Sequence, residues 1–564
     1  MAKAKKRVKV VNDNITVPEI VKCFISVHWR GVLTTVTPLI FLFVILPLPA
    51  EPYCWVAYTL LIMAVFWMTE CIPIAVTGFL PVVIFSLSGV MSTRNVCRCY
   101  MNDTIIMFLG SLFLANCIEQ SGVHKRLVYF AVRIIGYSHF KLLFAMCSVT
   151  TFVSMWISNT AATTMMVPIN FALLKVFEEE KVLKMYDTTP DGDLVASDMT
   201  TCYFCAATYS ATIGGIGTLV GTGTNLVFKG LFTTEYPKEP DYLSFPLFSA
   251  FAVPYMIVME AFMYLYLITL YFGAFRPDSP EAKSSKITPA AKEAAKKTVE
   301  KNAKALGPIR FHEIASLFLF AGAMVLFFCR SPQIFVGWAD VINENYGVTN
   351  PKYILDSAVC SIAIFIMLAL PSTLDFFKHF TVKYVEDIPK KPLKHVLDWT
   401  LTNRTMPYSF MFLLGGGFAL SNAAKISGLN DKIGDAMEVL KVFPLFVVIL
   451  FIITVVVLVT NFASNVAVAN VFVPIAMSLA KKIGYNPLWF CITAGFSASY
   501  CFLLPVGTPG NLVAQGAAKI PTKKMIKAGV GPTISTIIVS WFAFCFWCPI
   551  MWPAVYTLPE TAAE

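Results

Sequence analysis

Thirteen apolar runs, each long enough to form a helix, make up most of this 564-residue chain. Because about 20 consecutive apolar residues span a bilayer, a chain built this way is expected to cross a membrane many times. Only 14% of its residues are charged, against about 25% in an ordinary soluble domain, which excludes a water-soluble fold. The runs lie near residues 32–49, 54–70, 72–91, 104–137, 140–177, 204–231, 245–275, 312–330, 351–371, 406–437, 443–480, 486–517 and 526–552.

Two of these runs, 140–177 and 443–480, are too long for a single crossing, and each has a Ser-Asn pair near its middle. We interpret both as re-entrant hairpins that enter and leave the membrane on the same side. Eleven crossings remain. The prediction is an all-α polytopic membrane protein with 11 transmembrane helices plus two re-entrant hairpins.

The basic residues give the orientation. A net charge of +10 could suggest a nucleic-acid partner, but the basic residues lie in tails and loops that flank apolar runs, so none is expected. With a cytoplasmic N-terminus, the basic loops 276–311 and 372–405 both fall on the cytoplasmic side, as the positive-inside rule requires. The C-terminus is then extracellular. No organelle signal is visible, so the plasma membrane is the predicted location.

These assignments divide the chain into consecutive parts. The basic linker is interpreted as a surface amphipathic helix or a solvated connector, with contact to membrane lipid as a further possibility. The predicted parts are a cytoplasmic tail 1–31, a first transmembrane helix 32–53, a first repeat 54–275, the linker 276–311, a second repeat 312–552 and an extracellular tail 553–564.

An internal repeat is the sharpest signal in the sequence. Ser158-Asn159-Thr160-Ala161 and Ser464-Asn465-Val466-Ala467 stand 306 positions apart, and each is followed by Val-Pro-Ile at the same offset. Downstream of each lies Gly-Thr-x-x-Asn-Leu-Val, at 221–227 and 507–513. Matched blocks in one order are typical of a duplicated fold rather than of chance similarity.

The two halves are predicted to have opposite orientations in the membrane. Upstream of the hairpins, Gly110 to Gly122 also resembles Gly415 to Gly428. Each half contains five crossings and one hairpin, and an odd number of crossings inverts the second half. Inverted repeats with discontinuous helices that meet near the bilayer midplane are the plan of many secondary transporters.

The residue types of the repeat suit an anion. A helix broken within the membrane frees backbone N–H and C=O groups, which must face protein or a water-filled cavity. At Ser158-Asn159-Thr160, and at the Ser-Asn pair of the second hairpin, the freed N–H groups and the positive end of the helix dipole favour an anion. The breaks at Gly214 to Gly223 and Gly507 to Gly510 offer carbonyl oxygens to a small cation.

At these residues, and at Trp67-Met68-Thr69-Glu70 followed by Pro73 and Pro81, the chain resembles the divalent anion/sodium symporter family, the di- and tricarboxylate carriers. The resemblance implies a homodimer in which a transport domain moves against a scaffold as an elevator. It also implies two sets of site residues. The substrate-binding set is Ser158, Asn159, Thr160, Ser464, Asn465 and Val466, and the cation-site loops contain Gly223, Thr224, Asn225, Gly507, Thr508 and Asn511.

Departures from the family's pattern bear on substrate and coupling. In the family, Val at position 466 goes with citrate preference. Val468, Ala469 and Asn470 replace Thr-rich sequence, which removes hydroxyl ligands for sodium. We therefore predict sodium-independent transport, by anion exchange or proton coupling, with sodium-coupled symport as the alternative. Lys229, four residues after Asn225, either supplies fixed positive charge near the cation loop or extends to the outer interface.

The sequence contains no arrangement typical of an enzyme. It lacks an HExxH zinc motif and a nucleophile paired with His, and the CxxC pairs have no partnering pair or nearby His. No catalytic residue, cofactor or firm metal site is predicted. The predicted function is secondary active transport of citrate and C4 dicarboxylates such as succinate, and an anion channel is the alternative from another class.

Overall fold

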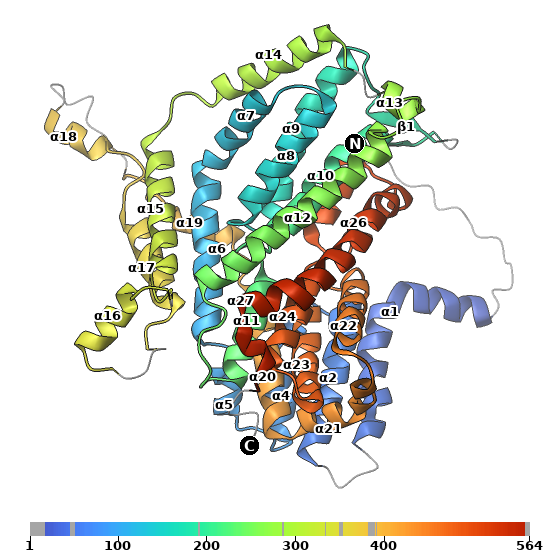
Figure 1. Ribbon diagram of the computed structural model, residues 1–564, viewed down its shortest axis with the longest axis vertical. Helices are drawn as coiled ribbons and strands as arrows, with labels where there is room; N and C mark the ends of the chain where they lie inside the picture. The colour runs from blue at the N-terminus through green and yellow to red at the C-terminus, as the bar shows by residue number, and fades with distance from the viewer. Residues whose placement is uncertain are drawn as a thin grey trace, which may run out of the picture.

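The computed structural model describes residues 17–45, 51–189, 192–284, 287–332, 334–348, 353–381, 390 and 392–558. Across these residues the protein is almost entirely helical (Figure 1). Eight of its helices are long and apolar enough to cross a membrane, and five shorter apolar helices accompany them. A polytopic helical membrane protein is thus confirmed. One small antiparallel pair departs from all-α, β1 (Tyr186–Thr188) with β2 (Leu194–Ala196).

The first half runs from the N-terminus to the basic linker. After α1 a short 3₁₀ turn, η1 (Leu42–Val44), ends the first helical segment. The helices of this half are α1 (Val17–Phe41), α2 (Pro52–Thr69), α3 (Ile74–Thr77), α4 (Leu80–Leu87), α5 (Thr93–Arg98), α6 (Asp103–Ser121), α7 (Val123–Ile135), α8 (His139–Ser154), α9 (Asn159–Glu179), α10 (Asp198–Gly214), α11 (Gly223–Glu235) and α12 (Phe245–Phe272).

The rest of the described chain consists of the linker helices α13 and α14 and the helices of the second half. Three short 3₁₀ segments, η2 (Asp375–Phe377), η4 (Glu438–Val442) and η6 (Pro553–Tyr556), and one π-helical segment, η5 (Ala543–Trp547), accompany the helices. The helices are α13 (Pro280–Ser284), α14 (Pro289–Ala305), α15 (Phe311–Phe328), α16 (Trp338–Asn345), α17 (Asp356–Ala369), α18 (Lys378–Thr381), α19 (Trp399–Thr405), α20 (Ser409–Ile426), α21 (Leu429–Ala436), α22 (Leu445–Thr460), α23 (Asn465–Ile483), α24 (Pro487–Ser497), α25 (Pro509–Ala518), α26 (Thr522–Phe542) and α27 (Cys548–Met551).

Two apolar runs that the sequence presents as continuous are divided in the structure. The run 104–137 breaks at Gly122, whose φ of 77° is in the left-handed region that glycine tolerates. Gly428, its counterpart in the second half, has a φ of 75° and ends α20 in the same way. The run 72–91 forms two short helices, because Pro73 and Pro81 both mark helix starts.

The boundaries of the first helix and of the linker also differ from the predicted ones. Helix α1 begins at Val17, well inside the predicted tail 1–31, and has a kink at His28. Residues 1–16 and 559–564, most of the two predicted tails, lie outside the described residues. The linker 276–311 contains α14, whose Ala291, Ala295 and Val299 are buried where it packs on α7 and α9.

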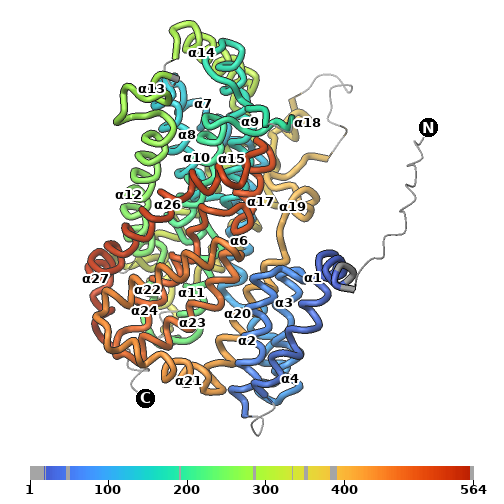
Figure 2. The backbone as a smooth tube through the Cα atoms, turned by 90° about the vertical axis from the view of Figure 1, so that its right-hand side faces the viewer, coloured from blue at the N-terminus to red at the C-terminus, as the bar shows by residue number. Residues whose placement is uncertain are grey.

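The two halves are interleaved rather than side by side. Helix α11 of the first half packs against α23 and α24, and α25 of the second half packs against α9 and α10. Figures 1 and 2 show α13 and α14 at one end of the molecule and α21 with the C-terminal segment at the other. The centre of the molecule is therefore built jointly by helices from both repeats.

Candidate functional site

The first predicted hairpin is a helix, a break and a second helix. Helix α8 ends at Ser154 and α9 begins at Asn159. Ser158 caps α9, since its Oγ accepts a hydrogen bond from the backbone N–H of Ala161 at 3.3 Å. The tip thus presents a helix N-terminus at the Ser-Asn pair, where backbone N–H groups and the helix dipole favour an anion.

A side-chain hydroxyl fixes this tip. Ser154 Oγ donates to the carbonyl of Ala211 on α10 at 2.6 Å and lies 3.0 Å from Asn159 Oδ1. Asn159 also packs closely on the backbone of Gly215, where any side chain would collide with its Oδ1. The glycine is therefore needed for the tip to sit on the loop that follows α10.

The second hairpin repeats the arrangement with different residues. Helix α22 ends at Thr460 and α23 begins at Asn465. Thr460 Oγ1 donates to the carbonyl of Ala498 at 2.7 Å and lies 2.9 Å from Asn465 Oδ1. Asn465 Nδ2 in turn donates to the carbonyl of Ser499 at 3.2 Å. The repeat of the sequence motif is thus matched at the level of single hydrogen bonds.

The two glycine-containing breaks are closed by the repeated asparagines. Between α10 and α11, the fully buried Asn225 donates from Nδ2 to the carbonyls of Gly215 at 3.1 Å and Thr218 at 2.7 Å. Each asparagine is the third residue of the helix that follows its loop. It therefore reaches back and pairs carbonyls that the preceding helix leaves free.

Asn511 does the same between α24 and α25. Its Nδ2 donates to the carbonyls of Cys501 at 3.1 Å and Leu504 at 3.0 Å. Thr508 caps α25 through a bond from the N–H of Asn511 to Thr508 Oγ1 at 3.4 Å. A side chain at Gly507 would collide with the backbone carbonyl of Thr460, the last residue of α22. This loop therefore packs directly against the second tip.

Each loop also touches the hairpin of the other half. A Cβ added at Gly223 would lie 3.3 Å from Val466, and one at Gly510 would lie 3.0 Å from Thr163 Oγ1 on α9. Val466 and Gly223, assigned to different sets by the resemblance, are thus neighbours. The loops and the hairpins form one assembly that draws on both repeats.

Two hydroxyl bonds, which sequence reasoning missed, tie this assembly together. Thr208 Oγ1 on α10 donates to Asn511 Oδ1 at 2.8 Å. Thr224 Oγ1 lies 2.5 Å from Ser499 Oγ. Both pairs are buried and join the two halves. Thr224 is among the predicted cation-site residues, but Thr and Ser in apolar helices are too common for its partner Ser499, or for Thr208, to stand out in a single sequence.

The two tips differ in exposure. Ser158 is exposed and Asn159 and Thr160 are half-buried, whereas Asn465 and Val466 are buried and Ser464 is half-buried. The first tip is therefore the more accessible of the two. The loop residues Thr224, Asn225, Gly507, Thr508 and Asn511 are buried, and Gly223 is half-buried.

Lys229 lies in a network of ion pairs with three other charged side chains, so it is not an isolated charge. Its Nζ is 2.9 Å from Asp356 Oδ2 and 3.8 Å from Asp241 Oδ1. Arg330 completes the network, with 2.7 Å ion pairs to each of the two aspartates. Lys229, 9% exposed, is thus ion-paired within the protein, and Asp103 also lies close enough to interact with it.

The first loop fits a small hard cation better than the second. Asn225 Oδ1 is buried and has no hydrogen-bond partner among the described residues, and it lies on the loop that also presents the carbonyls of Gly215 and Thr218. Hard cations take oxygen ligands of this type. In the second loop Asn511 Oδ1 already accepts the Thr208 hydroxyl. Within the described residues, no group of three or more His, Cys, Asp and Glu could hold a transition metal.

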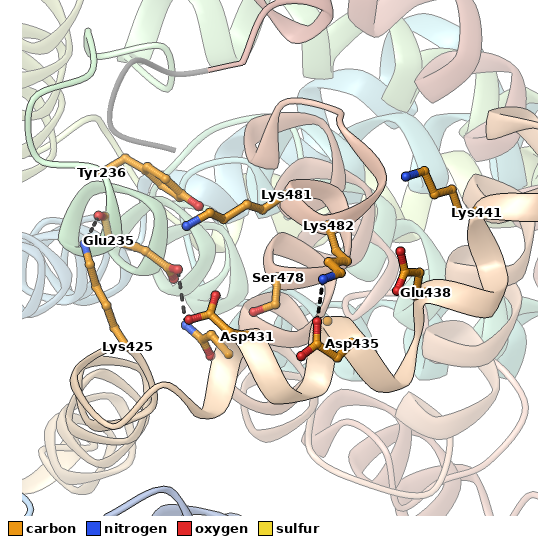
Figure 3. A pocket seen from close by; sticks show the side chains of 12 residues that line it. Glu235, Tyr236, Lys425, Asp431, Asp435, Glu438, Lys441, Ser478, Lys481 and Lys482 are labelled. Carbon is orange, nitrogen blue, oxygen red and sulfur yellow. Dashed lines mark hydrogen bonds and ion pairs between the residues drawn. The ribbon is translucent and has the colours of Figure 1, made fainter. Parts of the chain in front are cut away.

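A charged pocket lies at the other end of α23 (Figure 3). It has a volume of about 590 Å³ and is lined from α11, α20, α21 and α23, with Lys482 and Asp435 paired at 2.5 Å. Lys481 follows Asn465 by 16 residues on one helix, which places it about 24 Å from the tip. This pocket is therefore separate from the hairpin tips.

Comparison with known proteins agrees with this architecture. The family model described as the sodium:sulfate symporter transmembrane region matches residues 26–553. "Protein I'm not dead yet" of Drosophila melanogaster is 37% identical, with 96% of this chain and 93% of the relative covered. The Na(+)/citrate cotransporter of Rattus norvegicus is 31% identical, with 90% and 93% covered.

Two further matches widen the comparison. The Na(+)/dicarboxylate cotransporter 3 of Mus musculus is 30% identical, with 91% of this chain and 90% of the relative covered. The solved structure of Neisseria gonorrhoeae MtrF superposes with a TM-score of 0.52 at 12% identity, covering 93% of this chain and 98% of that one, a likeness of fold alone. The chain belongs to the sodium:sulfate symporter family and is a multi-pass membrane transporter, not an enzyme.

Proposed function

We propose that this chain is a secondary active carrier for citrate and C4 dicarboxylates such as succinate, located in the plasma membrane. The observation that carries the proposal is the pair of Ser-Asn tips, each at the start of a long helix and each fixed by the same pattern of side-chain bonds. The similarity to the rat Na(+)/citrate cotransporter and the mouse Na(+)/dicarboxylate cotransporter 3 supports it.

Uncharged groups would hold the substrate. Lys229 is neutralised by Asp356, so the substrate carboxylates would be bound by the backbone N–H groups and the Ser and Asn side chains of the two tips. Amide and hydroxyl donors aimed at carboxylates form charge-assisted hydrogen bonds. A methyl group of Val466, in the second tip, lies against Gly223, and we associate this apolar contact with citrate preference.

Transport would proceed by an elevator movement within a homodimer. The cross-repeat bonds of Thr208 with Asn511 and Thr224 with Ser499 join the hairpins and loops into one body that would move as a unit. The basic segments α13 and α14 lie at one end of the molecule, opposite α21 and the C-terminal segment (Figure 1). With the basic linker placed in the cytoplasm, the end of the molecule that contains α21 would face outside. The cytoplasmic N-terminus and extracellular C-terminus follow from the positive-inside pattern of the sequence and stay part of this proposal.

The coupling mode remains a choice between two candidates. The sequence predicts sodium-independent transport, by anion exchange or with protons. Sodium-coupled symport is the second candidate, favoured by the unpartnered Asn225 Oδ1 and by the names of the mammalian relatives. A sodium ion there would be held by Asn225 with the carbonyls of Gly215 and Thr218, and its charge would offset that of the anion.

Radiolabelled citrate uptake into proteoliposomes tests both the carrier function and the coupling mode. Saturable uptake with counterflow is expected for a carrier, and uptake without counterflow would instead indicate the anion channel. Replacement of sodium by choline should leave uptake unchanged if transport is sodium-independent. Loss of most uptake in choline would assign the coupling to sodium at the first loop. Parallel assays with succinate and sulfate define the substrate class.

A further inference from the structure

A single carboxyl group lies in the middle of the apolar helix α12. Glu260 is the one charged residue among the 28 residues of Phe245–Phe272. Its neighbours Ile257, Val258 and Phe262 are exposed on the outside of the helix, whereas Glu260 is half-buried. An ionisable residue within a membrane-spanning helix is costly to retain, so it calls for a functional explanation.

Glu260 faces α10 and α8 and has no ion-pair partner in the part of the chain that the structure describes. Its Oε1 accepts a hydrogen bond from Ser210 Oγ on α10 at 2.7 Å. Oε2 is shielded from solvent and has no partner within the described ranges. Thr151 and Cys147 of α8 also contribute side-chain hydrogen bonds to the Glu260 carboxyl group, and the Cys147 thiol is itself titratable. No charged side chain of α15, α26 or α27 pairs with it among the described residues.

Ser210 connects Glu260 to the first hairpin tip. The next residue on α10 is Ala211, whose carbonyl accepts the Ser154 hydroxyl at 2.6 Å, and Ser154 in turn lies 3.0 Å from Asn159 Oδ1. Thr151 Oγ1 donates to the Ser210 carbonyl at 3.4 Å, one turn before Ser154 on α8. The turn of α10 that binds Glu260 is therefore the turn that holds the predicted substrate-binding tip.

The second repeat serves as an internal control. The counterpart of Ala211 is Ala498, so the counterpart of Ser210 is Ser497, whose Oγ is buried and lacks a partner within the described residues. Helix α26, which follows α25 as α12 follows α11, contains no Asp or Glu. The second half thus has a matched helix without an acid, so the acid is not a feature of the repeated fold.

We propose that Glu260 is the proton-binding site that couples a proton to anion transport. The proposal rests on the proposed function as a carboxylate carrier and deepens its sodium-independent form. A proton from water on one side binds the carboxylate, forming an O–H bond at the unpartnered Oε2. That bond breaks when the proton returns to water on the other side. Protonation changes the charge beside Ser210, and through α10 it alters the position of the first tip.

The test uses purified full-length protein in proteoliposomes with labelled succinate, at and above neutral pH, where succinate is fully ionised. A neutral exterior with a more alkaline lumen is expected to accelerate wild-type uptake relative to equal pH on both sides, and Glu260→Gln is expected to lose this acceleration while still performing counterflow. A Glu260→Gln variant that keeps the acceleration would overturn the proposal, as would a wild type whose uptake ignores the gradient. Absence of any saturable uptake or counterflow in the wild type would instead refute the carrier function itself.

A second variant keeps the proposal testable if Glu260→Gln fails to fold or to exchange. Ser210→Ala removes the donor that stabilises the ionised carboxylate, so the pH midpoint of uptake should rise by about 0.5–1 unit, the equivalent of one hydrogen bond. Ser497→Ala, at the matched position of the second repeat, should leave the midpoint unchanged. An unshifted midpoint in Ser210→Ala would show that Glu260 does not set the pH dependence.

Discussion

The two glycine-containing loops, between α10 and α11 and between α24 and α25, share one pattern of hydrogen bonds to backbone carbonyls. They differ in the side chains that lie next to their asparagines. Asn225 and Asn511 each donate from Nδ2 to two carbonyls of the preceding loop. Asn511 Oδ1 also accepts the Thr208 hydroxyl, whereas Asn225 Oδ1 has no partner in the described part of the chain. The comparison teaches that the duplicated motif determines where helices break, while neighbouring side chains determine what each break can bind.

The helices that follow the two loops differ even more. Lys229 on α11 lies in a buried network with Asp356, Arg330 and Asp241. The matched position on α25, 286 residues later, is Gln515, which is half-buried and donates to Thr522 Oγ1 at 3.1 Å. One half therefore joins α11 to α17 through buried charges, and the other has no such connection at the matched position.

The largest expected effect comes from removing one charge of that network. Lys229→Met leaves Asp356 buried beside a single cation and should lower the free energy of unfolding by about 3–5 kcal/mol. Gln515→Met at the matched position should change it by less than about 0.5 kcal/mol. Thermal unfolding of detergent-solubilised protein measures both. If the two variants unfold at the same temperature, the claim that buried charges stabilise only the first half at this position is wrong.

The second-largest loss of stability is expected when the loop asparagines are replaced. Asn225→Ala and Asn511→Ala each leave buried carbonyls unpaired and should each lower the free energy of unfolding by about 1–3 kcal/mol. Asn511→Ala also leaves the Thr208 hydroxyl without its acceptor and should be the more destabilising of the two. Unfolding temperatures in sodium and in choline provide the measurement. If sodium raises the unfolding temperature of the wild type and of Asn511→Ala but not of Asn225→Ala, the first loop holds the cation and sodium-independent transport is wrong.

A smaller effect is expected at the tips, where Thr160 and Val466 occupy matched positions. Val466→Thr adds a hydroxyl to the buried second tip and should raise the ratio of succinate to citrate uptake about fivefold, the equivalent of roughly 1 kcal/mol. Competition between the two labelled substrates measures the ratio. Thr160→Val at the half-buried first tip is the matched control, and an equal change in both variants would argue against a selective role for position 466.

The smallest effect is expected at the surface of the charged pocket. Lys482 holds the pKa of Asp435 below its usual range, so this pair adds stability above the ordinary Asp pKa and loses it as the pH falls through the lowered value. Both side chains are exposed to solvent, which screens the pair. Lys482→Met should therefore give no measurable change in unfolding temperature at neutral pH. A change in unfolding temperature as large as that of Lys229→Met would show that solvent exposure does not determine how much an ion pair contributes to stability in this protein.

Much of the site was predictable because its signals are local. Ser158 and Ser464 precede helix starts, and the repeated Asn and Gly residues mark loops, so the breaks follow from residue types and their duplication. The pairing of Lys229 with Asp356 could not be predicted, since those residues lie 127 positions apart and meet only through packing. Glu260 did carry a signal, as a lone acid in a long apolar run, which sequence reasoning left unused.

The interleaving of the halves has a consequence for biosynthesis. Thr208 finds its partner Asn511 303 residues later, so the first half cannot complete its core while the ribosome is still making the second. At about 5–20 residues per second that interval lasts roughly 15–60 s. During this time several buried hydroxyls and amides of the nascent first half must be sheltered by the insertion machinery, and truncated chains are expected to be cleared by quality control.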